Sequence, residues 1–150
     1  MSGRKEKLLI NKLERLASRM VKTAMLAVGK PKKANKVDIF LLDDDEMKRL
    51  KRRFLPREKG PANVLSFAEP ADWPRSKGEP KKLGEVYLNT DLAESKMDNS
   101  KELIASKLIP LLLHGVLHLL GYDHKKKNDR IKMEKLEKRI ISNFQNTNLQ

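Results

Sequence analysis

All three histidines of the chain, His114, His118 and His124, fall in one short segment. On a helix, residues four apart are separated by about 40° around the axis and about 6 Å along it, so the rings of His114 and His118 can converge on one cation. Gly121 can let the backbone leave the helix, and the following turn can return His124 to the same point. Three neutral imidazoles with a fourth position open are typical of a catalytic zinc site. The sequence therefore predicts one metal ion on these three histidines.

The alternative is that each histidine is an ordinary core or surface residue. Two polar rings on a buried apolar helix need a partner that compensates for their burial, so the spacing favours a metal site. Asp123 could be a fourth ligand, a partner that orients an imidazole, or a turn residue, and its position favours the turn. Imidazole also binds nickel and other divalent transition metal ions, so ligand type does not single out zinc. Zinc is expected only because it is more available.

The spacing is also that of the metzincin peptidase motif, H-E-x-x-H-x-x-G-x-x-H, with Gly115 in place of the catalytic glutamate. A peptidase uses that carboxylate as its general base. Phosphodiester hydrolysis can do without it, because a bound ion lowers the pKa of water from about 15.7 to about 7 and stabilises phosphoryl charge. The motif favours phosphodiester hydrolysis, with a metallopeptidase as the alternative.

Positive charge points to a polyanionic partner. The chain has 33 Lys and Arg against 20 Asp and Glu, a formal charge of +13, concentrated in residues 1–36 and 48–59. Such clusters can follow a phosphate backbone, although lysine-rich helices can also be simply well solvated. Aromatic residues make up 5% of the chain, too few for an extended base-stacking surface. We expect nucleic acid to be held mainly by its backbone.

The absence of cysteine excludes disulfides and thiolate ligands and fits a reducing cytoplasm. The sequence shows neither a signal segment nor an uninterrupted apolar stretch of membrane-spanning length. We expect a cytoplasmic protein without membrane association, folded as a single domain over residues 1–150.

Periodicity predicts the elements that position the histidines. Long helices are expected from about Leu9 to Gly29, from Leu103 to Leu120 and from about Ile131 to Phe144, the second of them capped by Asn99 or Ser100. A shorter helix is expected from a cap in Asp43–Asp45 to Phe54. A brief helix should also begin at a cap formed by Thr90 or Asp91. Strands are expected at Val37–Leu42, Val64–Phe67 and Gly84–Asn89, loops at Leu55–Ala62 and Glu69–Lys82, and a disordered tail at Gln145–Gln150.

The helix with the histidines is apolar on nearly every side, so it should lie at the centre of the fold. Pro110 should bend this helix or mark its true start. The element order predicts an α+β fold in which helices cover a small mixed sheet.

The segment His114–His124 resembles the YbeY endoribonucleases, which act in bacterial ribosomal RNA maturation. Two further stretches carry the resemblance, Pro61-Ala62-Asn63-Val64-Leu65-Ser66-Phe67 and Leu83-Gly84-Glu85-Val86. The resemblance implies a compact α+β fold, a metal on the three histidines, and single-stranded RNA as substrate, with ribosomal RNA or ribosomal particles as partners.

The resemblance also implies a functional arginine shortly before the Pro-x-Asn-Val-Leu-Ser-Phe segment. Arg57 is the nearest match, four residues before Pro61 where the family usually has five. A guanidinium beside a metal site could clamp a phosphate, whereas a solvated loop arginine is the alternative. Ser66 could bind substrate or satisfy a backbone group.

Three hypotheses follow for the function. The first is a metal-dependent endoribonuclease in which His114 and Arg57 take part in catalysis, with Glu134 and Asp123 as candidate general bases. The second is a metallopeptidase. The third is an RNA-binding or ribosome-assembly module with a structural metal.

Overall fold

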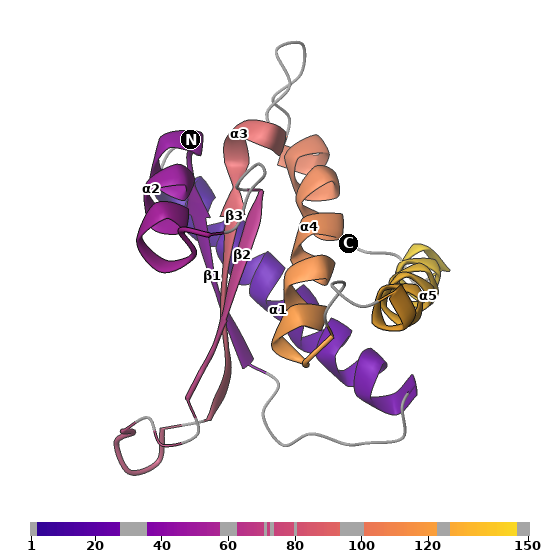
Figure 1. The fold of residues 1–150 in the computed structure, drawn as a ribbon. Helices are drawn as coiled ribbons and strands as arrows, with labels where there is room; N and C mark the ends of the chain where they lie inside the picture. The colour runs from indigo at the N-terminus through magenta and orange to yellow at the C-terminus, as the bar shows by residue number, and fades with distance from the viewer. Residues whose placement is uncertain are drawn as a thin grey trace.

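The computed structural model describes residues 3–27, 36–57, 63–70, 72, 74–79, 81–93, 101–122 and 127–146. Within these ranges the element order is helix, strand, helix, two strands and then three helices (Figure 1). The elements are α1 (Gly3–Ala27), β1 (Lys36–Leu42), α2 (Asp44–Phe54), β2 (Val64–Ala68), β3 (Lys82–Asn89), α3 (Thr90–Ala93), α4 (Lys101–Leu119) and α5 (Lys127–Asn146).

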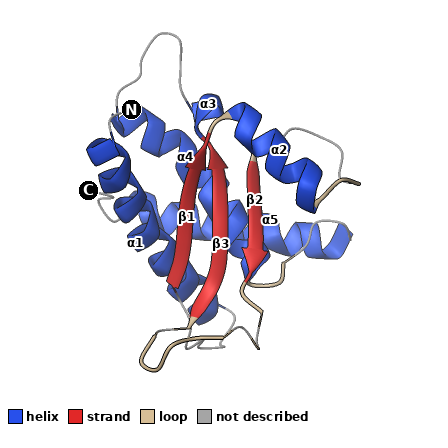
Figure 2. Ribbon diagram, turned by 90° about the vertical axis from the view of Figure 1, so that its left-hand side faces the viewer, coloured by secondary structure: helices blue, strands red, loops and turns tan. Residues whose placement is uncertain are grey.

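The three strands form one mixed sheet in the order β1-β3-β2. β3 runs parallel to β1 and antiparallel to β2, so it is the central strand (Figure 2). Helices α1 and α4 cover one face of the sheet, and α2 lies on the other. The predicted α+β class with a small mixed sheet is confirmed.

The main core lies between the sheet and helices α1 and α4. Its side chains come from the apolar stripe of α1, from successive turns of α4, from alternate positions of the strands and from one side of α5. The fully buried ones include Leu13, Met20, Val37, Val86, Leu88, Leu112, Leu113, Val116 and Leu117. Helix α4 contacts α1, β2, β3 and α5. The prediction that the apolar helix is central is confirmed.

Helix α2 covers the opposite face and begins at a capping box. The Asp43 side chain accepts a hydrogen bond from the Glu46 N–H, and the Glu46 side chain accepts one from the Asp43 N–H. These bonds satisfy backbone donors that a helix start leaves unpaired. Met47 is fully buried here against Leu65 of β2. The predicted aspartate cap and the end at Phe54 are confirmed.

Element ends differ from the predictions where tertiary contacts extend or cap an element. β3 begins at Lys82, because Lys82 already pairs with Lys36 of β1. Helix α3 is capped by Asn89, whose side-chain oxygen accepts from the Asp91 N–H. Helix α4 continues through Pro110, so this proline does not mark the start of the helix. Proline cannot donate a hydrogen bond to the carbonyl four residues earlier, but Pro110 lies on an exposed side of α4, where water can bind that carbonyl.

At the carboxyl end, α5 extends to Asn146, past the expected end at Phe144. Three predicted features lie mostly or wholly outside the described residues: the tail at Gln145–Gln150, the cap at Asn99 or Ser100, and the loop at Leu55–Ala62. None of the helices in the described ranges is long and apolar enough to cross a bilayer.

Candidate metal centre

His114 and His118 lie one turn apart near the end of α4 and face each other. Their Nε2 atoms are 3.0 Å apart, and their ring centroids are separated by 4.5 Å with an angle of 78° between the planes. Both side chains are half-buried, on a helix whose other faces are packed in the core. The predicted convergence of the two rings is therefore present in the structure.

The spacing of these two nitrogens fits a shared transition metal ion. Two Zn–N bonds of about 2.0–2.1 Å at a tetrahedral angle separate the nitrogens by about 3.3 Å. The observed separation of 3.0 Å is close to that value. Within the described ranges no group of three or more His, Cys, Asp and Glu side chains forms a metal cluster. The third predicted ligand, His124, and its neighbour Asp123 lie outside these ranges.

The chain leaves α4 through a turn that depends on Gly121. The Tyr122 N–H donates to the Leu117 carbonyl at 3.0 Å, and the Gly121 N–H donates to the His118 carbonyl at 3.0 Å. This pair of bonds is the Schellman motif, which requires a left-handed residue at the position of Gly121. Gly121 has a φ of +98°. The prediction that Gly121 redirects the backbone after the two histidines is confirmed.

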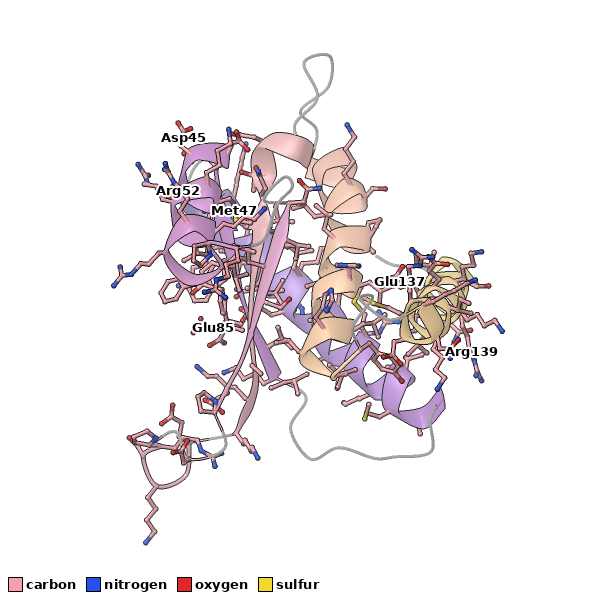
Figure 3. All side chains as sticks on the ribbon, in the orientation of Figure 1. Asp45, Met47, Arg52, Glu85, Glu137 and Arg139 are labelled. Atoms are coloured by element: carbon pink, nitrogen blue, oxygen red, sulfur yellow. The ribbon has the colours of Figure 1, made fainter. Side chains whose placement is uncertain are left out.

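Glu137 of α5 contacts the first histidine and was not identified from the sequence. Its Oε1 atom lies 3.3 Å from Nδ1 of His114, so the two ring nitrogens of His114 face Glu137 and His118 respectively. Figure 3 shows Glu137 on the side of α5 that faces α4, whereas Arg139 lies on the outer side. Glu134, the glutamate singled out from the sequence, is exposed.

A signal for Glu137 was present in the spacing of α5. Among the residues of this helix whose burial is described, Met133, Leu136 and Ile140 are buried. Glu137 follows Met133 by four residues and precedes Ile140 by three, so it lies on the same stripe. A carboxylate on an apolar stripe requires a polar partner, but the sequence alone does not say which residue supplies it.

Gly115 brings α4 against the sheet. A Cβ atom at this position would lie 2.9 Å from Ser66 Oγ, 2.9 Å from Val86 Cγ1 and 3.1 Å from Val64 Cγ2. Ser66 Oγ donates a hydrogen bond to the Gly115 carbonyl at 3.0 Å, so this serine satisfies a backbone group. Position 115 faces β2 and β3, where a glutamate does not fit. The helix therefore cannot carry the metzincin general base at that position.

Arg57 is exposed and follows the end of α2. Residues 58–62, which connect it to β2, lie outside the described ranges. The role predicted for this arginine stays a prediction.

A cavity of about 490 Å³ lies on the α2 face of the sheet, away from the histidines. Its walls include Phe54, Phe67 and several carboxylates. Lys82 Nζ binds Asp38 Oδ2 at 2.6 Å, and the Tyr87 hydroxyl donates to Glu85 Oε2 at 2.8 Å. Burial and the Glu85 hydrogen bond raise the pKa of Tyr87 to about 12. This cavity and the candidate metal centre are separate sites.

Comparison with known proteins identifies the family. The sequence matches the family described as Endoribonuclease YbeY over residues 2–145. It is 34% identical over 131 residues to a protein of that name from Paramagnetospirillum magneticum, covering 86% of this chain and 79% of the relative.

A second relative of the same name, from Syntrophotalea carbinolica, is 32% identical over 144 residues, with 91% and 87% of the two chains covered. A third, from a Wolbachia strain of Drosophila simulans, is 35% identical over 108 residues, with 72% and 68% covered. The match extends over nearly the whole sequence, including the helix with the paired histidines and the glycine turn after it. The chain therefore belongs to the YbeY endoribonuclease family.

Proposed function

We propose that this protein is a metal-dependent endoribonuclease that hydrolyses phosphodiester bonds in single-stranded RNA. The observation that carries the proposal is the 3.0 Å approach of the His114 and His118 Nε2 atoms at the end of α4. Membership of the YbeY family supports RNA as the substrate.

In this proposal His114, His118 and His124 hold the ion, and zinc is the expected metal. A bound zinc ion supplies an acidified water molecule and a Lewis acid for the phosphoryl oxygens. The helix contributes rigidity, because His114 and His118 are separated by one turn whose backbone is packed against β2 and β3. The Gly121 turn leads the chain out of α4 three residues before His124.

Arg57 is proposed to engage a phosphate of the substrate. A guanidinium can bind two oxygens of one phosphate and stabilise charge that develops during phosphoryl transfer. Its exposure at the end of α2 leaves it accessible to a large substrate. No general base is assigned, since Glu134 is exposed on α5 and Asp123 lies outside the described residues.

The RNA strand is proposed to lie along positively charged helix surfaces. Helix α5, which carries Glu137 beside the histidines, also carries six exposed basic residues: Lys127, Arg130, Lys132, Lys135, Lys138 and Arg139. Such residues bind a phosphate backbone without reading the bases, and the affinity they contribute falls as salt rises. We further propose ribosomal RNA as the target, the cytoplasm as the location, and one domain over residues 1–150 as the unit that acts.

A peptidase function is not supported by the packing of position 115. The peptidase motif requires a glutamate there, and the space is filled by Ser66, Val64 and Val86. Hydrolysis of an unfolded protein by the zinc-loaded form, without cleavage of RNA, would overturn the proposal in favour of a peptidase.

The test combines elemental analysis with RNA cleavage for the wild type, His118→Ala and Lys132→Ala. We expect about one zinc ion per wild-type chain, and loss of both metal and cleavage in His118→Ala. Lys132→Ala is the matched surface control, and it should keep the metal while its RNA binding weakens and becomes less salt-dependent. Wild-type cleavage that continues after complete chelation would refute the metal-dependent mechanism and support a structural metal.

A further inference from the structure

We propose that Glu137 is a positioning residue that holds His114 in the tautomer required for binding the ion through Nε2. This inference rests on the proposed metal site at His114 and His118. It adds a residue of α5 to a pair of histidines that both lie on α4.

The argument begins with the protons of the His114 ring. A carboxylate can only accept hydrogen bonds, so the 3.3 Å contact with Glu137 Oε1 places the proton of the neutral ring on Nδ1. The other nitrogen, Nε2, then carries a lone pair directed at the Nε2 atom of His118, 3.0 Å away. A metal ion binds that lone pair, so the contact with Glu137 selects the tautomer that can act as a ligand at this point.

Packing holds the carboxylate in place. Helix α5 is anchored by Met133, Leu136 and Ile140, and it contacts both α1 and α4. The Glu137 side chain is 28% exposed and the His114 side chain 34% exposed, so the pair is partly shielded from water. A partner whose backbone is already fixed orients the ring at little further entropic cost.

The position of Glu137 argues for a role beyond solubility. The helix is rich in lysine and arginine, and an exposed glutamate such as Glu134 is enough to moderate that charge. Glu137 instead lies on the buried stripe, where a carboxylate is costly unless it is paired. Histidines that bind metals commonly donate their second N–H to a carboxylate, and loss of that partner typically lowers metal affinity by about 10–100-fold.

The test compares Glu137→Ala and Glu137→Gln with Glu134→Ala, a matched control on the exposed side of the same helix. The first readout is the tautomer of the neutral His114 ring in metal-free protein, measured from its ¹⁵N chemical shifts. We expect the Nδ1–H form in the wild type and in Glu134→Ala, and a shift toward Nε2–H in Glu137→Ala. Glutamine should preserve the Nδ1–H form, because its amide oxygen also accepts.

The second readout is zinc affinity, measured by competition with a chromophoric chelator. Glu137→Ala should bind zinc about 10–100-fold more weakly, Glu137→Gln should fall between Glu137→Ala and the wild type, and Glu134→Ala should match the wild type. Thermal unfolding identifies any variant that fails to fold, and Glu137→Gln keeps the shape of the side chain.

Two outcomes overturn different claims. If Glu137→Ala leaves the tautomer and the zinc affinity unchanged while His114→Ala weakens zinc binding, the positioning role is refuted and the metal site stands. If His114→Ala leaves zinc binding unchanged, the metal site itself is refuted.

Discussion

The substitution Gly115→Ala tests how closely α4 must approach the sheet. The added Cβ atom would lie 2.9 Å from both Ser66 Oγ and Val86 Cγ1, closer than such atoms normally come. Overpacking of this kind costs about 1–3 kcal/mol, and the better helix propensity of alanine offsets up to about 1 kcal/mol. These terms leave about 0–3 kcal/mol, and we expect about 1–2 kcal/mol because the methyl group meets Ser66 Oγ, Val86 Cγ1 and Val64 Cγ2 at once. A loss of this size lowers the Tm by about 2–8 °C for a domain of this size.

The assay is thermal and urea unfolding of Gly115→Ala, Ser66→Ala and the double variant. Because the new methyl group meets the serine oxygen, removing that oxygen should reduce the cost of Gly115→Ala, and the coupling energy of the cycle should be about 0.5 kcal/mol or more. Gly3→Ala is the control, since nothing lies within 4 Å of a Cβ atom there. A Gly115→Ala protein as stable as the wild type would refute the tight helix–sheet contact and, with it, the argument that excludes a glutamate at this position.

Three further predictions concern capping and ionisation. Asp43→Ala removes the side chain that accepts from the Glu46 N–H and should lower the free energy of unfolding by about 0.5–2 kcal/mol in urea titrations. Burial, together with the charge of Asp38, raises the pKa of Glu14 above 4.5. Because the folded state favours the protonated acid, the free energy of unfolding falls as pH rises from the ordinary pKa of glutamate through the raised pKa of Glu14. Glu14→Gln should therefore have a higher Tm than the wild type at pH 7 and the same Tm in acid. Equal Tm values at pH 7 would contradict this. Tyr87 should ionise near pH 12 in an ultraviolet titration of the folded protein, with stability falling as pH rises above 10; the transition should be absent in Tyr87→Phe, and ionisation at the ordinary value would show the reasoning to be wrong.

Much of the fold followed from local periodicity. The stripe of α1 and the apolar surface of α4 predicted packed helices, and three short runs predicted the strands. These features depend on the repeat of the backbone, which is the same wherever the element lies. The strand order β1-β3-β2 was not predicted, because pairing between distant strands leaves no mark in their spacing. For the same reason the start of β3 at Lys82 and the Asn89 cap of α3 were not predicted. The start of β3 depends on its register with β1, and the cap depends on a turn that is already folded.

The candidate site divides in the same way. The four-residue spacing of His114 and His118 determined by itself that their rings could meet, because a helix turn has a set rise and rotation, and the glycine at 121 determined that the chain could turn away after them. Only the tertiary structure decided that Glu137 reaches His114 and that Gly115 is pressed against Ser66, because both contacts join residues far apart in the chain. A sequence shows which groups a helix presents on each side, but the neighbour that meets each side depends on how all the elements pack.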